Sequence, residues 1–334
     1  MTNQAAFLDS KQSHPLSVRD SEIPQPGAGE VVIENFAVGF NPLDWKIQKY
    51  GIYFEKFPLI LGSDAGGRVY SVGKDVSRLK VGDRVSVYIS ELFNGRTDAG
   101  VFQKYVRLTA QSTIFKLPEK YSYSQGATFG LCAATAAQGL YSEKQLNLPL
   151  PGNESSQQKT ILVYGGSSSV GQFVIQFAKQ SGLKVVSTVS AKNQALVKRC
   201  GADQVIDRND PNLGDLLQKA GPFDCAFDCI SEGNAAKIVS EAMQPNGGRV
   251  TTVLPWEFEA PSNVTTSKGM ALSVRTEDKT KDWFRPFMEE CLAKGTLQLP
   301  PVQEISGGLA AIQKVLDDYA EKGVSGTKLI VTGL

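Results

Sequence analysis

The sequence predicts an α/β protein that combines a compact β-barrel with a parallel sheet covered by helices on both faces. Over residues 1–127, short apolar runs such as GEVVIENFAVGF, AGGRVYSVG and GDRVSVYIS are separated by turn residues, a spacing typical of barrel strands. From residue 159 onward, nearly continuous apolar segments alternate with helical stretches instead. Strands that are apolar throughout are buried on both faces, so this half predicts a doubly wound parallel sheet.

The elements of that sheet follow one another along the chain. We expect strands in TILVYGG, KVVSTVS, ADQVIDR, FDCAFDCI and GGRVTTVLP, and helices at 171–181, 192–200, 212–220 and 233–243. A helix is also expected in SYSQGATFGLCAATAAQGLYSEKQ, which opens on a serine suited to an N-cap. We expect GMALSVRT to add an edge strand and PWEFEAPSNVTTSKG to form an irregular loop. A helix in GGLAAIQKVLDDYAEKG then leads to a last strand in GTKLIVTGL.

Length and charge limit the classes of function. A chain of 334 residues can form two domains, and 35 Lys and Arg against 34 Asp and Glu leave a formal charge of +1. This balance favours neither nucleic acid nor an anionic membrane as a partner. The start, MTNQAAFLDSKQ, shows no signal-peptide pattern, and no apolar run approaches the roughly 18 residues that a membrane span needs. We therefore expect a cytoplasmic protein.

Cysteine and histidine usage predicts free thiols and no metal. A zinc site needs three or four convergent ligands, and this chain has one histidine and no C-x-x-C pair. The closest cysteine pair lies in FDCAFDCI, which we expect to be a strand. An odd number of scattered cysteines is typical of free thiols in a reducing compartment. The residues concerned are His14, Cys132, Cys200, Cys225, Cys229 and Cys291.

The stretch VYGGSSSVGQ at 163–172 predicts a dinucleotide-binding turn. It follows an apolar strand and precedes an amphipathic helix, and Gly166 and Gly171 fit the first and third glycines of G-x-G-x-x-G. Ser168 stands at the middle position, where a small residue still allows close approach, provided that it does not need a positive φ. The alternative is an ordinary turn with helix-capping serines. The residues expected to hold the pyrophosphate at the helix N-terminus are Gly166, Ser167, Ser168, Ser169, Val170 and Gly171.

The next strand end favours NADP(H) over NAD. NAD sites usually place a carboxylate about 20 residues beyond the turn, but here STVSAKNQ offers Ser190, Lys192 and Asn193 instead. A cation and small hydrogen-bond donors suit a 2′-phosphate, and Arg208 after the apolar QVI is expected to add a second cation. The alternative for Lys192 is a solvated lysine that opens a helix.

Taken in order, these motifs resemble the medium-chain dehydrogenase/reductase superfamily over nearly the whole chain. They are PQPGAGEVVI, GFNPLDWKIQ, LGSDAGGRVYSVGKDVSRLKVGDRV, GGSSSVGQFVIQFAKQSG and KRCGADQVID. The residues of these motifs are most similar to those of the zinc-free quinone-oxidoreductase and enoyl-reductase branch. This branch includes fungal trans-acting enoyl reductases that serve polyketide synthases. The resemblance implies a GroES-like catalytic domain from 1–127 and 279–334, with a Rossmann NADP-binding domain inserted at 128–278.

Differences from the zinc enzymes of this superfamily restrict the class of acceptor that we expect. Those enzymes carry a catalytic cysteine where this chain has NPLDW, a histidine where it has GSDAGG, and four cysteines after GDRV, where it has none. Without these ligands, an acceptor activated by conjugation is favoured: an enoyl thioester, an enone or a quinone. Hydride would add to the β-carbon, and donors would stabilise the enolate oxygen.

The resemblance also implies which residues line the cleft. Asn41, Lys46 and Thr135 are the catalytic candidates, and Asp44, Trp45 and Lys46 would lie against the nicotinamide end of the cofactor. From the residues alone, Asn41 before a proline also suits a turn, Lys46 also suits a surface position, and Thr135 also suits a helix interior. Further nicotinamide contacts are expected from Val253, Leu254, Val324 and Ser325.

An aromatic stretch, YGIYFEKFP, suggests one wall of an apolar substrate pocket, because such sites are mostly apolar and aromatic. We expect Tyr53 and Phe54 there, with Trp256 on the irregular loop; ordinary barrel packing is the alternative. The function expected is NADPH-dependent reduction of a conjugated small molecule, free or bound to a carrier protein, in fungal secondary metabolism. The alternatives are a redox-neutral, cyclase-like enzyme and a non-catalytic NADPH-binding protein, as a monomer or a homodimer.

Overall fold

The computed structural model describes the chain except residues 1, 153–158 and 277–278, and divides it into two compact units. Unit 1 comprises Met1–Leu131, Met288–Lys294 and Leu299–Leu334, and unit 2 comprises Cys132–Phe287 and Gly295–Gln298. The predicted domain limits at 127 and 279 stay a prediction, and residue 278, the predicted end of the inserted domain, lies outside the described residues.

Unit 1 is built on strands from both ends of the chain. Its larger sheet has the order β15-β16-β3-β5-β6-β8, with β7 also paired to β3. The strand β3 is long enough to pair with β7 through its first half and with β16 through its last residues, antiparallel in both cases. The tail of the chain thereby completes the sheet of the N-terminal segment. The bounds are β3 Glu30–Gly39, β5 Asp64–Val72, β6 Arg84–Tyr88, β7 Tyr105–Thr109, β8 Thr113–Lys116, β15 Val302–Ile305 and β16 Lys328–Thr332.

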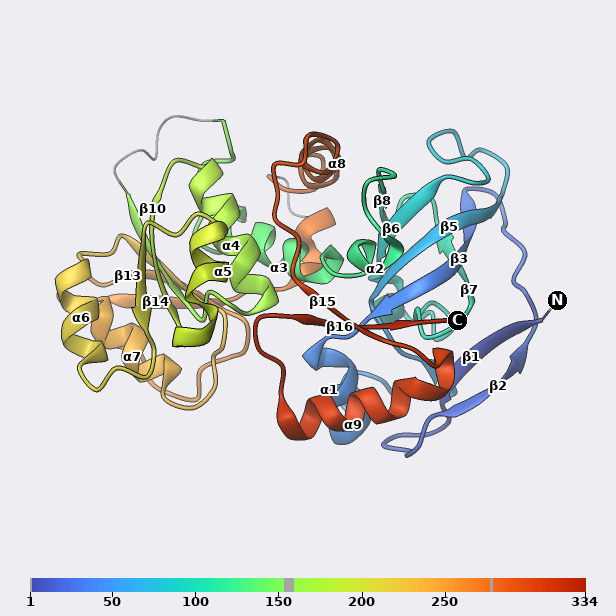
Figure 1. Ribbon diagram of the computed structural model, residues 1–334, viewed down its shortest axis with the longest axis horizontal. Coiled ribbons are helices and arrows are strands. Elements are labelled where there is room, and N and C mark those ends of the chain that lie inside the picture. Colours follow the sequence, from blue (N-terminus) through green and yellow to red (C-terminus); the bar gives the residue numbers. More distant parts are fainter. Residues whose placement is uncertain (1, 153–158, 277–278) are drawn as a thin grey trace. The chain divides into compact units, whose positions relative to one another are not determined.

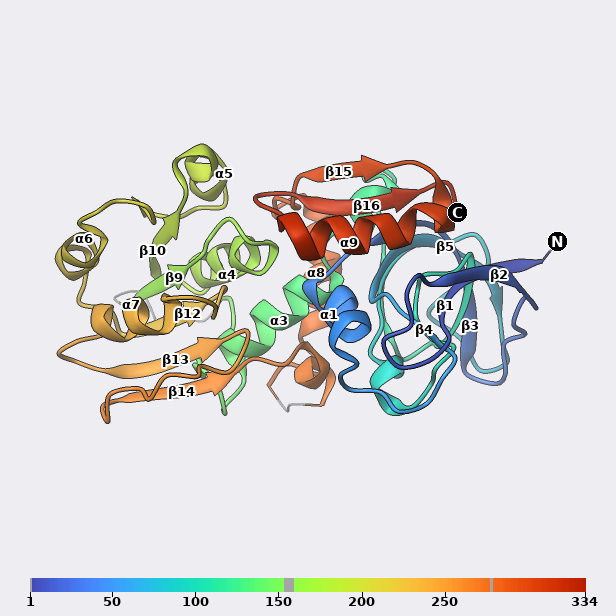
Figure 2. The ribbon, with the colours of Figure 1, turned by 90° about the horizontal axis from the view of Figure 1, so that it is seen from below.

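A smaller sheet and several helices complete unit 1. The sheet has the order β2-β1-β4, with β1 at Asn3–Leu8, β2 at Ser17–Ser21 and β4 at Leu59–Ile60. Helices α1 (Pro42–Tyr50) and α9 (Ile312–Lys322) lie side by side in both views (Figures 1 and 2). Ile47 of α1 and Ile312 of α9 enter the same core as Val31 and Val38 of β3. The short helix α2 (Tyr123–Gly126) follows β8, and α8 spans Phe284–Lys294, of which Met288–Lys294 belong to unit 1.

Helix α1 begins inside the segment NPLDWK. Asn41 is its extended N-cap, Pro42 opens the first turn, and Gly51 ends the helix with a φ of 60°. Asp44, at the third helical position, accepts the backbone N–H of Asn41 at 2.7 Å. This is the local pattern expected of a helix start, because Pro and an acidic residue both suit the first turn. Asp44 is only 1% exposed, and burial raises its pKa to about 7, against the lowering effect of the Asn41 N–H.

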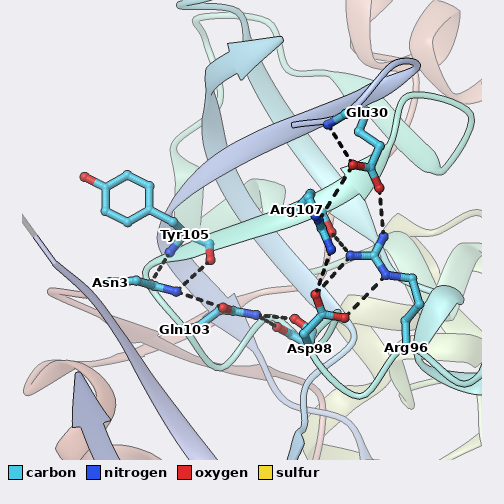
Figure 3. A network of polar contacts seen from close by, with 9 residues as sticks. Asn3, Glu30, Arg96, Asp98, Gln103, Tyr105 and Arg107 are labelled. Carbon is cyan, nitrogen blue, oxygen red and sulfur yellow. Dashed lines mark hydrogen bonds and ion pairs between the residues drawn. The ribbon is translucent and has the colours of Figure 1, made fainter. Parts of the chain in front are cut away.

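An ion-pair network fixes the chain between β6 and β7 (Figure 3). Asp98 contacts the guanidinium groups of Arg96 and Arg107, with N–O distances of 3.2 and 3.5 Å. Glu30, on β3, contacts the same two arginines at 3.6 and 3.7 Å. Gln103 donates to the carbonyl oxygen of Asp98 at 2.7 Å. Each partly exposed pair contributes little alone, but together they tie this segment, with its 3₁₀ helix η1 (Glu91–Asn94), to β3.

Unit 2 is a six-stranded parallel sheet in the order β11-β10-β9-β12-β13-β14, which is the doubly wound arrangement of dinucleotide-binding folds. Leu162, Val186, Ala226 and Val250 stand in register across four strands and form a core with α6 and α7. The bounds are β9 Thr160–Tyr164, β10 Lys184–Val189, β11 Gln204–Asp207, β12 Cys225–Asp228, β13 Gly248–Thr252, β14 Val264–Lys268, α3 Gly130–Tyr141, α4 Ser169–Gln180, α5 Gln194–Arg199, α6 Leu213–Ala220 and α7 Ala235–Ala242.

The edge of this sheet corrects one prediction. The expected edge strand GMALSVRT is wrong: residues Ala271–Arg275 form the 3₁₀ helix η4, and the sixth strand lies earlier, within the expected loop, at Val264–Lys268. The segment VTTSK, which opens with three β-branched residues, pairs with β13. Just beyond the strand, the N–H of Met270 donates to the side chain of Gln138.

Two predictions concern the whole chain: the state of its cysteines and whether any segment could span a membrane. All five cysteines are buried and none of them is in a disulfide, as expected, and burial raises the pKa of the Cys225 thiol to about 12. No helix within the described ranges combines the length and the apolar character that a bilayer crossing requires.

The buried carboxyl of Asp44 predicts a specific pH dependence of stability. Its folded pKa lies above its unfolded value of 3.8, so its contribution to stability is fully present below about pH 4 and is lost as the pH rises through 7. Asp44→Asn keeps an acceptor for the N–H of Asn41 and removes this titration. Between pH 5 and pH 8, the free energy of unfolding of the variant should rise relative to the wild type by on the order of 2 kcal/mol. Denaturant unfolding at both pH values measures it; a difference independent of pH would contradict the assignment.

Candidate functional site

The turn after β9 has the geometry that close packing of a cofactor loop requires. Gly165 has a φ of 85°, and its N–H donates to the Thr188 side chain at 3.0 Å. A Cβ at Gly166 would lie 2.0 Å from Ser187 Oγ, and one at Gly171 would lie 2.5 Å from the carbonyl oxygen of Gly165. The positive-φ glycine is therefore Gly165, which the sequence analysis did not single out. The signal in the sequence that could have identified Gly165 is the pair of adjacent glycines at the end of the strand.

Ser168 is the N-cap of α4. Its φ of −63° meets the condition that the sequence analysis set for a serine at this position, and its Oγ accepts the N–H of Gly171 at 3.0 Å. The N–H groups of Ser169 and Val170, the first two residues of α4, have no acceptor in the part of the chain that the structure describes. These two groups and the positive end of the helix dipole suit an anion such as a phosphate.

The strand order of this sheet reverses between β9 and β12. The glycine turn follows β9 on one side of this point, and the carboxyl end of β12 lies on the other side. Asp228, fully buried, accepts the N–H groups of Ile230 and Ser231 and, at 2.8 Å, the indole N–H of Trp256. The N–H of Val253 donates to the carbonyl oxygen of Asp228 at 3.2 Å. Val253, Leu254 and Trp256 thus follow β13 at the edge where ligands bind in open α/β sheets. Trp256 packs against the core of unit 2.

The residues expected near a 2′-phosphate also lie at this edge. Val189 pairs with Asp207, and the N–H of Arg208 donates to the carbonyl oxygen of Val189 at 2.9 Å. Ser190 and Arg208 therefore leave neighbouring strands at the same level. Lys192, in the 3₁₀ helix η3 (Ala191–Asn193), and Arg208 are exposed. Asp207 accepts the N–H of Asn209 within its own loop.

In unit 1, the segments NPLDW and GSDAGG meet at a buried charge cluster. Asn41 donates its side-chain N–H to Asp64 Oδ2 at 3.0 Å. Lys328 Nζ donates to Asn41 Oδ1 at 2.6 Å and to Asp64 Oδ2 at 3.3 Å. Asn41, Asp64 and Lys328 are all at most 3% exposed. Asp64 and Lys328 are not among the residues predicted from the sequence. The signal that could have identified this cluster is the lysine inside the apolar strand GTKLIVTGL, since lysine is rarely buried without a partner.

The described residues do not fit a zinc ion at this place. Among them, no group of three or more His, Cys, Asp and Glu side chains converges. Asp64 is the carboxylate in the cluster, and its second oxygen, Oδ1, accepts the N–H of Leu131 at 2.8 Å. An ammonium group 3.3 Å from Oδ2 adds a charge that repels a divalent cation.

The outer side of α1 carries the other candidates of unit 1. Trp45 and Lys46 are half-buried, with Lys46 Nζ 5.4 Å from the centre of the Trp45 ring. Tyr53 is 59% exposed and has a φ of 73°, and its ring and that of Phe54 both contact Phe93 of η1, with centroids 6.0 and 5.2 Å apart. Phe93 is a third aromatic that the sequence analysis did not name.

The remaining candidates are placed as follows. Val324 is half-buried and Ser325 exposed in the loop that precedes β16 of unit 1. Thr135 is 7% exposed on α3 in unit 2. Unit 1 thus brings Asn41, Asp44, Trp45 and Lys46 together on one helix start, and unit 2 brings the glycine turn, Ser190, Arg208 and Val253 to one sheet edge.

Comparison with protein-family models identifies both units. The model described as the alcohol dehydrogenase GroES-like domain matches residues 27–119, and the model described as zinc-binding dehydrogenase matches residues 169–272. Among curated proteins, the dehydrogenase orsE of Emericella nidulans is 35% identical, covering 99% of both chains. The trans-enoyl reductase ACTTS2 of Alternaria alternata is 36% identical, over 99% of this chain and 98% of its own.

Solved structures share the fold over the full length. An alcohol dehydrogenase superfamily protein from Novosphingobium aromaticivorans superposes with a TM-score of 0.83 at 24% identity, covering 100% of both chains. A quinone oxidoreductase from Pseudomonas syringae gives a TM-score of 0.79 at 22% identity, also covering 100% of both. With its GroES-like unit, its Rossmann-type unit and its full-length relatives, the chain belongs to the medium-chain dehydrogenase/reductase superfamily.

Proposed function

We propose that this protein is an NADPH-dependent reductase that transfers hydride to the double bond of a conjugated acceptor. The family and the fold imply a nicotinamide cofactor, and the observation that carries the proposal is the turn at Gly165–Gly171, whose two open N–H groups suit a pyrophosphate. Full-length relatives named trans-enoyl reductases support the enoyl class of acceptor. The acceptor we propose is an enoyl thioester, an enone or a quinone, free or bound to a carrier protein, in a cytoplasmic secondary pathway.

The preference for NADPH rests on the edge of unit 2. Lys192 and Arg208 are exposed cations at adjacent strand ends, where a 2′-phosphate would accept charge-assisted hydrogen bonds. Ser190 and Asn193 add small polar groups. The side chain of Asp207, the nearby carboxylate, accepts a hydrogen bond from the N–H of Asn209 in its own loop. We propose that these cations select the phosphorylated cofactor.

The chemistry proposed for the residues follows from the acceptor class. Bound NADPH supplies the hydride. As charge develops on the acceptor's carbonyl oxygen, a positioned N–H or O–H donor lowers the barrier. We propose that the ammonium group of Lys46 and the hydroxyl group of Thr135 provide such donors, and that a side chain or water delivers a proton to the α-carbon. The donor set around Asp64 does not fit a metal, so the activation proposed here comes from conjugation and hydrogen bonding. Tyr53, Phe54 and Trp256 are the proposed apolar contacts of the acceptor.

Consumption of NADPH tests the reductase proposal. Purified protein with NADPH and a panel of enones, quinones and enoyl thioesters should show a fall in NADPH absorbance that depends on both enzyme and acceptor. Titration without acceptor measures binding separately. If NADPH binds but no conjugated acceptor consumes it, a redox-neutral enzyme or a non-catalytic binding protein replaces the proposal; if NADPH does not bind at all, the proposal fails at its first step.

The two cations at the sheet edge predict the cofactor preference. Lys192→Ala with Arg208→Ala should raise the KM for NADPH by about 10–100-fold, because the 2′-phosphate loses its charge-assisted bonds. The KM for NADH should change by less than about threefold. Lys198→Ala, which removes an exposed lysine from α5 of the same unit, serves as the matched control. Equal losses for both cofactors would show that these residues do not contact the 2′-phosphate.

A further inference from the structure

The triangle formed by Asn41, Asp64 and Lys328 is a group of buried polar side chains in the candidate region of unit 1. Lys328 Nζ is 2.6 Å from Asn41 Oδ1 and 3.3 Å from Asp64 Oδ2, and Asn41 closes the triangle with its own bond to Asp64 Oδ2 at 3.0 Å. The side chains of Lys328 and Asp64 are 4% and 0% exposed. Such a pair interacts strongly because water does not screen it.

The triangle joins three segments of unit 1 at one carboxylate. Asn41 is the N-cap of α1, Asp64 is the first residue of β5, and Lys328 is the first residue of β16. The other oxygen of Asp64 accepts the N–H of Leu131, at the start of α3. Space for the carboxylate comes from glycine: a Cβ at Gly130 would lie 2.7 Å from Asp64 Oδ1.

Stability alone is a weak reason to keep such a pair. Taking two charges out of water is costly, and apolar residues of similar size often serve as well or better. What an ion pair adds is geometry, because its bonds form only in one arrangement of the segments that it joins. The residue that this geometry controls most directly is Asn41, where α1 begins.

The start of α1 sets the direction of the side chains that follow it. Asn41 and Asp44 are buried on the inner side, while Trp45 and Lys46 are half-buried. Asp44 and Lys46 are two residues apart, or about 200° around the helix axis, so fixing Asp44 inward turns Lys46 outward. A rotation or fraying of the first turn would displace both together.

We propose that the triangle of Asn41, Asp64 and Lys328 is a positioning device that holds the first turn of α1 and thereby aims Lys46 at the reacting groups. The inference rests on the proposed role of Lys46 in the reductase. Lys328 and Asp64 act as positioning residues, through Asn41, and do not touch the acceptor. The C-terminal strand thus controls a residue more than half the chain away from it in sequence.

Kinetics of Lys328→Met test this inference. With NADPH and an active acceptor, kcat should fall by about 10–100-fold, since small displacements of a positioned group cost rate. The KM for NADPH should stay within about threefold, because the proposed cofactor contacts of unit 2 are untouched. In a Lys46→Ala background, Lys328→Met should cause no further loss of kcat, because it acts through Lys46. Losses that multiply, or an unchanged kcat in the single variant, would overturn the proposal.

Two further variants separate positioning from general damage. Arg78→Met removes the half-buried ion pair with Glu289, elsewhere in unit 1, and should leave kcat within about twofold. A loss in this control equal to that of Lys328→Met would overturn the assignment of a specific role. Asp64→Asn is isosteric and removes the charge that Lys328 faces; it should reproduce the fall in kcat and serves as the test if Lys328→Met does not fold.

Hydrogen exchange tests whether the triangle holds the start of α1, and it needs no measurement of enzyme activity. In Lys328→Met, the amides of the first turns of α1, residues 44–47, should exchange faster than in the wild type, while α4 of unit 2 should not change. Unaltered exchange in α1 would overturn the positioning role even in an active enzyme. If the wild type consumes no NADPH, the proposed function fails, and faster exchange in α1 still shows that the triangle holds the helix start.

Discussion

The contact between the Lys328 ammonium and the Asp64 carboxylate is the constraint on which unit 1 depends. It joins the last strand of the chain to the segment GSDAGG and, through Asn41, to the start of α1. Charges buried to this extent must be paired, so each member fixes the others. The strand pairing of β16 with β3 brings the tail to this place, and the ion pair then determines how closely the tail is held. The two segments where zinc enzymes of the superfamily hold metal ligands are thus joined here by an ammonium group.

Local patterns were sufficient to predict much of unit 2. Strand and helix positions followed from apolar runs that alternate with amphipathic segments, and the glycine turn followed from its place between a strand and a helix. The prediction at GMALSVRT is wrong because the local sequence does not decide which of two neighbouring segments reaches the sheet edge. Tertiary pairing with β13 makes VTTSK, which we expected to be part of a loop, the edge strand. Gly165 was missed because the strand ends at Tyr164, one residue earlier than the position that the motif alone would assign.

Unit 1 contains contacts that local sequence patterns cannot predict. Asn41, Pro42 and Asp44 carry the signature of a helix start, so α1 could be predicted from its own sequence. No local pattern links Asn41 to Lys328, because 287 residues separate them. The same holds for Phe93, which contacts Tyr53 and Phe54 from a segment about 40 residues away in the sequence. Such contacts depend on the complete fold.

Three helix starts in this chain satisfy their backbone N–H groups differently, and the difference bears on why a serine replaces the middle glycine. The N-cap N–H of α1 is taken by Asp44, and an N–H of the first turn of α3 is taken by Asp64. At α4 the cap is the neutral hydroxyl of Ser168, and the N–H groups of Ser169 and Val170 have no acceptor among the described residues. A carboxylate cap would repel a pyrophosphate, whereas a serine caps the helix and leaves its positive end available. Glycine would allow the same approach but would leave the helix uncapped, so Ser168 stabilises the turn without excluding an anion.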